Sequence, residues 1–288
     1  MATTSPSQSL LHWFLSIRPW NVLAMGVMVL VAMRWLGVPL QALADRAMWG
    51  WLAVPMLVGA AGNLINDFFD VKEDRINKPK RARIGRTLKR RVVIVTHWGL
   101  SVAALCWSGA LASHLGSSWP IVFTAALSVV LYIYSPMLKG RGIVGNLAVS
   151  VCVAALLVWA RMATGLPLDL TGNADQMWLL ATVTLWGLNL TREWVKDLQD
   201  LEGDRAAGHR TWASQLTPRQ NQGGLAVNVV VWSALGGTCA WLEGAHVAWL
   251  ASWAVLLVVG TVRAWQQNVV FVSAWLKVAM AVLFAQMW

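Results

Sequence analysis

Apolar residues fall in long blocks along this chain, and short polar segments separate the blocks. Each block is close to the ~20 residues that an α-helix needs to cross the hydrocarbon core of a bilayer. The blocks cover about 21–38, 48–66, 92–112, 119–135, 143–162, 176–193, 224–241, 246–262 and 271–288. The pattern predicts an all-α, polytopic membrane protein with nine transmembrane helices in a single domain that covers residues 1–288.

The composition agrees with a membrane protein. The 288 residues are 57% hydrophobic and only 12% charged, whereas a soluble domain carries about 25% charged residues. Residues 1–17 are weakly amphipathic and lack the small-residue cleavage site of a signal peptide. We therefore expect a short interfacial helix there, followed by a first block that stays in the membrane.

The basic residues indicate which loops face the cytoplasm. The net charge is +10, and ten Lys and Arg residues lie between Lys72 and Arg91. Others follow the fourth, sixth and eighth blocks, and no basic soluble domain is present to bind nucleic acid. By the positive-inside rule these loops are cytoplasmic, including about 67–91 and 194–222. The N-terminus is predicted on the cytoplasmic side of the cell (inner) membrane and the C-terminus outside.

The acidic residues are concentrated in two short segments. Of 13 Asp and Glu residues, nine lie in 67–74 and 193–204. The first segment repeats polar side chains at offsets of 0, 4, 7 and 11, and so does the second: Asn63, Asp67, Asp70 and Asp74, then Glu193, Asp197, Asp200 and Asp204. On a continuous helix this spacing places all four on one face. Such carboxylates repel each other unless a cation lies among them.

Hard oxygen ligands on two helices suit Mg²⁺, and the absence of clustered thiolates and imidazoles disfavours zinc. Arg75, Lys78, Lys80 and Arg81 follow the first segment, and Arg205 follows the second. Cations mixed with metal-binding carboxylates are typical of a diphosphate site.

Two alternatives stay open. The acids could form i,i+4 pairs on solvated helix ends, or the chain could be a cation-coupled transporter, although transporters place carboxylates near mid-membrane.

Five motifs carry a resemblance to the UbiA family of intramembrane prenyltransferases. They are Arg18-Pro19-x-Asn21, Asn66-Asp67-x-x-Asp70-x-x-x-Asp74, Tyr134-Ser135-x-x-Leu138-Lys139, Gly145-Asn146 and Lys196-Asp197-Leu-Gln-Asp200-Leu-Glu-Gly203-Asp204. The resemblance implies nine helices around a central cavity that opens sideways to lipid. It also implies Mg²⁺-assisted departure of diphosphate from a polyprenyl donor, after which the allylic cation alkylates a lipophilic acceptor.

The same resemblance implies roles for individual residues. The implied Mg²⁺ ligands are Asn66, Asp67, Asp70, Asp74, Asp197, Asp200 and Asp204. Catalytic roles are implied for the six aspartates together with Tyr134 and Lys139. Substrate contacts are implied for Arg18, Asn21, Asn63, Asn66, Arg75, Lys78 and Lys196. Glu193 is either a further Mg²⁺ ligand or a residue that only lies on the same helix face as the ligands.

The acceptor is the least defined partner. Segments 66–79 and 192–204 are most similar to the branch that makes archaeal-type ether lipids, in which geranylgeranyl is transferred to geranylgeranylglyceryl phosphate. The run Pro79–Arg86 departs from that branch. The alternative is an aromatic acceptor, as in quinone, tocopherol or chlorophyll synthesis. Membrane lipids are expected to surround the protein.

Overall fold

The computed structural model describes residues 6–79, 82–165, 168–169, 171–244 and 246–288, so Lys80 and Arg81 lie outside the described residues. The long helices in this part of the chain are α2 (Pro19–Trp35), α3 (Arg46–Phe69), α5 (Arg90–Leu115), α6 (Trp119–Ile133), α7 (Ile143–Met162), α8 (Asn173–Gln199), α11 (Pro218–Leu242), α12 (Val247–Trp265) and α13 (Val269–Ala285). The shorter elements are α1 (Pro6–Ile17), η1 (Leu40–Ala44), α4 (Val71–Asn77), η2 (Tyr134–Leu138), β1 (Arg141–Gly142), α9 (Leu201–Ala206), β2 (Arg210–Thr211) and α10 (Trp212–Gln215).

The all-α class is confirmed, and each predicted apolar block coincides with one long helix. Among the described residues, seven helices are long and apolar enough to cross a membrane. The two blocks outside that group differ for separate reasons: α13 is short, with 17 residues, and α8 carries several charged residues near its C-terminal end. The count of nine is therefore close to the observed number but not confirmed by it.

The contacts divide the chain into two compact units, which are described separately. Unit 1 comprises residues 1–30, 39–140 and 202–209, and unit 2 comprises 31–38, 141–201 and 210–288. The second acidic segment is shared between them, because residues 202–204 belong to unit 1 and residues 193–201 belong to unit 2.

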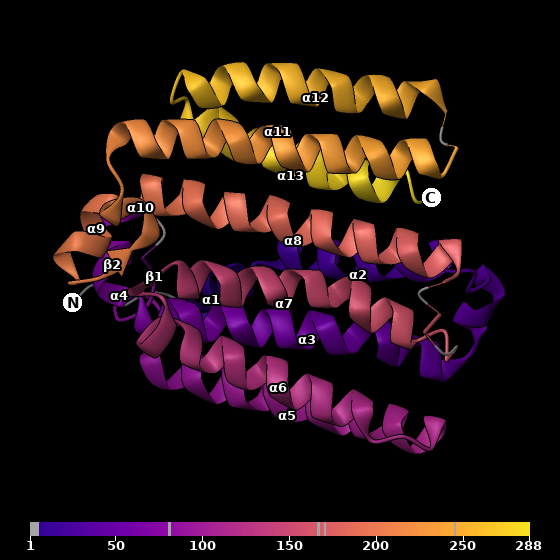
Figure 1. The fold of residues 1–288 in the computed structure, drawn as a ribbon. Coiled ribbons are helices and arrows are strands. Elements are labelled where there is room, and N and C mark those ends of the chain that lie inside the picture. The colour runs from indigo at the N-terminus through magenta and orange to yellow at the C-terminus, as the bar shows by residue number, and fades with distance from the viewer. Residues whose placement is uncertain (1–5, 80–81, 166–167, 170, 245) are drawn as a thin grey trace. The chain divides into compact units, whose positions relative to one another are not determined.

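In unit 1, α3 is the central helix. It packs against α5, α6 and α1, and α5 and α6 run alongside it in Figure 1. At the polar end, the loop after α4 folds back so that Ile84 and Leu88 are buried with Leu64 and Val93, and Trp13 of α1 covers them. Burial of these apolar side chains holds the polar loop against the end of α3.

In unit 2, α8 is the central helix. It packs against α7, α11 and α13, and α12 packs on α11 and α13. Large side chains fit where a neighbouring helix has glycine: a Cβ at Gly187 would lie 2.2 Å from Trp232, and one at Gly236 would lie 2.3 Å from Trp253. Close packing of this kind is how helices associate in lipid, where the hydrophobic effect does not drive them together.

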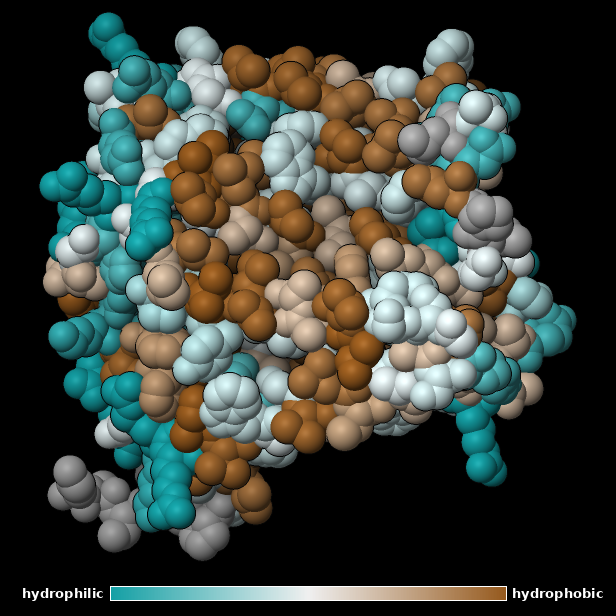
Figure 2. Space-filling model, turned by 60° about the horizontal axis from the view of Figure 1, so that its bottom comes forward, coloured by the Kyte–Doolittle hydropathy of each residue, from teal (hydrophilic) through white to brown (hydrophobic). Residues whose placement is uncertain are grey.

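The surface matches a bilayer environment. On the face drawn in Figure 2, apolar side chains occupy the middle, and hydrophilic ones collect towards the edges. The exposed apolar residues include Val255 and Val258 of α12 and Val95 and Val102 of α5, all more than half exposed. An exposed apolar surface of this extent is expected where lipid, rather than water, is the solvent.

One expectation about the acidic segments is wrong. Each segment was expected to continue as one helix, but α3 ends at Asp70, where ψ is 20°, and α8 ends at Asp200, where ψ is 9°. A new short helix starts immediately after each break. The Asp70 side chain makes no capping hydrogen bond to the backbone at its break and instead contacts Asn66 and Lys139. Asp74 and Asp204 therefore lie on the short helices and not on the long ones.

Candidate functional site

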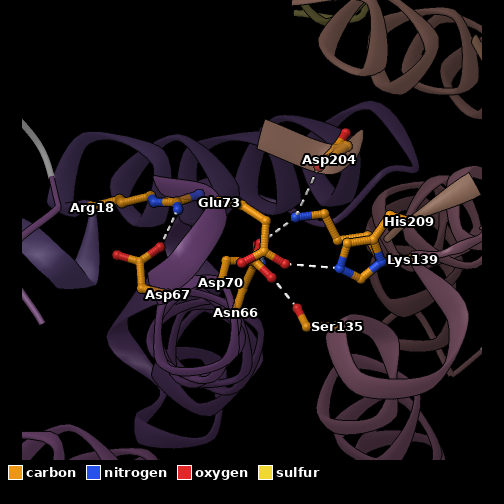
Figure 3. Close-up of polar contacts among 9 residues, drawn as sticks. All are labelled: Arg18, Asn66, Asp67, Asp70, Glu73, Ser135, Lys139, Asp204 and His209. Carbon is orange, nitrogen blue, oxygen red and sulfur yellow. Dashed lines mark hydrogen bonds and ion pairs between the residues drawn. The ribbon is translucent and has the colours of Figure 1, made fainter. Parts of the chain in front are cut away.

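The C-terminal end of α3 presents three polar side chains of the first motif. Asp67 is paired with Arg18, which lies between α1 and α2. Asn66 Nδ2 donates to Asp70 and, at 3.0 Å, to Ser135 Oγ of η2 (Figure 3). Arg18 has φ 59°, a conformation uncommon for a residue with a side chain. The turn between α1 and α2 thus brings its guanidinium to the end of α3.

Lys139 connects the two acidic motifs within unit 1. Its Nζ lies 2.7 Å from Asp70 and 3.7 Å from Asp204. The π-helical turn η2 ends at Lys139, whose backbone N–H donates to Tyr134 at 2.8 Å. Burial lowers the pKa of Lys139, but the carboxylates of Asp70, Asp204 and Glu73 outweigh it and raise the pKa above its usual value. Lys139 is therefore a permanent cation between two aspartates.

Asp204 is positioned by a tight contact between α9 and α4. The Gly203 N–H donates to Asn77 Oδ1 at 2.8 Å. A Cβ at Gly203 would lie 2.3–2.6 Å from three atoms of the Asn77 side chain, so only glycine fits without displacement. Asp204 itself is 2% exposed. The close approach of α9 to α4 thus explains why the second motif has glycine at position 203.

Glu73 and His209 form a further pair that the motifs do not include. His209 Nε2 lies 2.8 Å from Glu73 Oε1, and Glu73 is buried (Figure 3). Glu73 also contributes to the field at Lys139. Sequence reasoning did not single out Glu73, His209 or Asn77, and it quoted Ser135 only as a member of a motif, without a role. Glu73 could have been found because it is acidic and next to Asp74, but His209 is a single residue in a loop without a spacing signal.

Acidic side chains are crowded at this site. Asp67 is paired with Arg18, and Asp70 and Asp204 are paired with Lys139, while the charges of Arg83 and Lys78 also act on Asp67 and Asp74. Burial, followed by repulsion from Asp67 and Asp70, raises the pKa of Asp74 to about 6. An environment that disfavours a carboxylate's negative charge in this way is one that a bound cation would stabilise.

The donor set fits Mg²⁺, which prefers a few carboxylate oxygens and completes its coordination with water and substrate phosphate. Within the residues that the structure describes, no three acidic or other ligating side chains already converge on one point. Arg18 holds one carboxylate and Lys139 holds another. An anionic substrate could take over both cations, and the carboxylates would then be available to a metal ion.

Unit 2 contains the remaining residues of the second motif. Asn146 Nδ2 of α7 donates to Asp197 Oδ2 at 3.0 Å. Glu193 is buried and accepts from Arg192 at 2.8 Å and from Lys196 at 2.6 Å. Glu193 thus pairs with two neighbouring cations. Asp200 is at the end of α8.

The other predicted site residues have varied surroundings. Asn63 Nδ2 donates to the Ile17 carbonyl at 3.0 Å and so joins α3 to the end of α1. Asn21 is exposed in the first turn of α2, and Arg75 and Lys78 are exposed at α4. Tyr134 is half-buried in the turn before Lys139. The roles predicted for these residues remain predictions.

Comparisons with known proteins agree with the motifs. The chain is 35% identical to the digeranylgeranylglyceryl phosphate synthase of Korarchaeum cryptofilum over 163 residues, which are 57% of this chain and 54% of that protein. It is 30% identical to the enzyme of the same name from Methanothrix thermoacetophila over 205 residues, or 71% of each chain. The match thus spans about half the length of the first relative and more of the second.

Solved structures share the fold. A structure of digeranylgeranylglyceryl phosphate synthase in membranes aligns with a TM-score of 0.69 at 19% identity and covers 97% of both chains. A UbiA homolog from Archaeoglobus fulgidus, bound to DMAPP and Mg²⁺, aligns with a TM-score of 0.59 at 14% identity, covering 96% of this chain and 98% of that one. The model of the UbiA prenyltransferase family matches residues 21–285. This chain therefore belongs to the UbiA prenyltransferase family.

Proposed function

We propose that this protein transfers a polyprenyl group from a polyprenyl diphosphate to a lipophilic acceptor, with Mg²⁺ as the cofactor. The observation that carries the proposal is the bridge Asp70–Lys139–Asp204, in which one cation joins residues of both acidic motifs. Carboxylates and cations mixed in one partly buried cluster are suited to a metal-bound diphosphate.

Asn66, Asp67, Asp70, Asp74 and Asp204 of unit 1 are the proposed Mg²⁺ ligands at this cluster, and Asp197 and Asp200 of unit 2 remain proposed ligands as well. When bound, Mg²⁺ would stabilise the negative charge that develops on the departing diphosphate. The donor set and the raised pKa of Asp74 support this assignment.

Arg18 and Lys139 are the proposed diphosphate contacts. Arg18 is paired with Asp67, and Lys139 is paired with Asp70 and Asp204; phosphate oxygens would take the place of these carboxylates when the donor binds. Because the pKa of Lys139 is raised, its ammonium group stays charged and can donate to the leaving group throughout the reaction. The apolar helices beside the cluster exclude water, which would otherwise compete with the acceptor for the allylic cation.

The proposed acceptor is geranylgeranylglyceryl phosphate, and the supporting observation is the name shared by the two relatives compared above. Aromatic acceptors are the alternative within the family. The proposed setting is the cell membrane, with the basic loops, the acidic cluster and the N-terminus on the cytoplasmic side.

Purified protein in detergent tests the proposal. Geranylgeranyl diphosphate, Mg²⁺ and a panel of acceptors should yield free diphosphate and one prenylated product. Asp70→Asn and Asp204→Asn should each lower kcat/KM by roughly 100-fold or more, since each removes a charge that acts on the transition state. The matched control is Glu202→Gln, which neutralises an exposed acid on the same short helix as Asp204. Full turnover by the doubly substituted protein would refute the proposal.

A further inference from the structure

Two arginines lie opposite each other on a short ladder outside the cluster described above. β1 pairs in parallel with β2, and the register places Arg141 opposite Arg210. Partners in a parallel ladder project from the same face, and the strands lie about 4.8 Å apart. Arg141 and Arg210 are exposed, whereas Gly142 and Thr211 are buried. The two guanidinium groups therefore share one exposed face.

The ladder is held in a defined position by α10. Gln215 Nε2 donates to the Arg210 carbonyl at 2.9 Å, and Ser214 Oγ donates to the Thr211 carbonyl at 2.7 Å. Gly142 has φ 61°, and a Cβ there would lie 2.9 Å from Gln215 Nε2. Glycine is thus required on both conformational and steric grounds. The backbone that carries the arginines is built by several specific contacts.

Like charges directly opposite each other destabilise a sheet. In the part of the chain that the structure describes, neither guanidinium is paired with a carboxylate. The 20-residue helix α7 starts directly after Gly142. The partial positive charge of its first turn therefore adds to the charges of the two guanidinium groups. A dianion between the arginines would relieve the repulsion. Two forked guanidinium groups match the oxygens of a phosphate in particular.

We propose that Arg141 and Arg210 bind the phosphate monoester of the acceptor, which makes a phosphorylated lipid alcohol the acceptor class; this inference rests on the proposed function. A phosphate monoester carries a charge of about −1.5 to −2 near neutral pH. The carboxylates around Lys139 would repel it, whereas the arginine pair attracts it. Along the chain, Arg141 follows Lys139 by two residues, and Arg210 follows His209 directly.

Steady-state kinetics with geranylgeranylglyceryl phosphate and geranylgeranyl diphosphate test the assignment. The double variant Arg141→Gln/Arg210→Gln should raise the KM of the acceptor by roughly tenfold or more, because charge-assisted hydrogen bonds are lost. The kcat and the KM of the donor should each change by less than about twofold, because the arginine pair binds the acceptor equally well in the ground state and in the transition state. Arg219→Gln removes one exposed arginine elsewhere in unit 2 and should change neither KM. Arg141→Lys/Arg210→Lys should fall between the parent and the glutamine variant.

A binding measurement without donor separates this inference from the proposed function. Radiolabelled geranylgeranylglyceryl phosphate should bind the parent protein more tightly than the unphosphorylated geranylgeranylglycerol does, and the glutamine variant should bind both alike. If the parent transfers no prenyl group to any acceptor, the proposed function fails. The binding measurement would still show whether Arg141 and Arg210 bind the phosphate group. Equal binding by parent and variant would overturn the inference. So would a variant that loses co-purified membrane phospholipid but keeps the acceptor KM, because the pair would then hold bilayer headgroups.

Discussion

At the scale of single residues, Lys139 determines the state of the acidic cluster. It is the cation between Asp70 and Asp204, and both carboxylates are strongly buried. Removing one partner of a buried ion pair leaves the other charge uncompensated, which costs more than the pair itself contributes. The cluster should therefore tolerate loss of Lys139 poorly, unless another cation replaces it.

Lys139→Gln should lower the stability of the metal-free protein by about 3 kcal/mol, because Asp70 and Asp204 would then repel each other directly. Added Mg²⁺ should recover more of the lost stability in this variant than it adds to the parent. Thermal unfolding in detergent, with EDTA or with Mg²⁺, measures both effects. Lys72→Gln, which changes an exposed lysine of α4, is the control. An equal Mg²⁺ response in variant and parent would count against metal binding by these aspartates.

Gly203→Ala should lower activity by roughly tenfold or more, because its Cβ must displace the Asn77 side chain and with it Asp204. Adding Asn77→Ala opens the space, so the double variant should be no worse than Gly203→Ala alone. This non-additivity, measured in a double-mutant cycle, separates a steric clash from independent effects. Gly99→Ala, in a helix position with open space around it, should be neutral or slightly stabilising. Additive losses would show that the contact is not the cause.

At the scale of elements, both acidic segments use the same arrangement. A long helix ends at its third polar position, Asp70 or Asp200, and a short helix follows. The break thus occurs at the same position of the repeated spacing in both segments. At the second break the chain passes from unit 2 to unit 1. The break therefore allows residues that are close in sequence to belong to different units.

At their other ends, α7 and α8 are joined by a buried ion pair. Arg161 Nε and Nη2 donate to the two Asp175 oxygens at 2.6 and 2.9 Å, and the Asp169 N–H donates to Asp175 at 2.7 Å. The Arg161 side chain, followed by that backbone N–H, lowers the pKa of Asp175 to about 2. Asp175 thus neutralises Arg161, a basic residue near the C-terminal end of α7.

Asp175→Asn should therefore destabilise the protein by about 3 kcal/mol at pH 7. The folded pKa of Asp175 is below its unfolded value of about 3.9, so the stabilisation is complete above that value and is lost as the pH falls towards about 2. The difference in unfolding midpoint between parent and variant should shrink over that range. Asp45→Asn, which keeps an amide oxygen to cap α3, is the control. A difference that stays constant as the pH falls would contradict the pairing.

At the scale of the whole molecule, the distribution of basic residues predicts an orientation in the membrane. The loops after α3, α6 and α8 contain most of the Lys and Arg residues between helices, and positive loops stay in the cytoplasm. The opposite side has few basic residues, among them Arg161 near the end of α7. This asymmetry is the basis of the predicted orientation.

Cysteine labelling of intact cells tests the orientation. In a background without Cys106, Cys152 and Cys239, Ser117→Cys should react with a membrane-impermeant maleimide, whereas Ala206→Cys should react only after the cells are permeabilised. Both positions are exposed, so access alone should decide the result. The reverse pattern would place the acidic cluster outside the cell and would remove the argument for cytoplasmic substrates.

Much of the fold and part of the site could be predicted from local patterns. The apolar blocks located all the long helices within a few residues, because helix length in a bilayer is set by the membrane itself. The acidic spacing singled out Asp67, Asp70, Asp74 and Asp204, which the structure brings into one cluster within unit 1, and their roles stay predictions. The breaks at Asp70 and Asp200 were not predicted, since a helical spacing does not show where the backbone leaves the helix. Glu73 and His209 were missed because these two partners are 136 residues apart in sequence.

The sequence by itself determined the class of protein, the positions of its helices and the family, because block length, charge bias and motif spacing are local properties of the chain. Only the tertiary structure decided which charges meet. Lys139 could have been a membrane-surface anchor, yet its ammonium group lies between Asp70 and Asp204. Arg141 and Arg210 looked like two more positive loop residues, yet the ladder places them side by side. Electrostatic interactions act through space, and sequence separation alone does not set the distance between two charges.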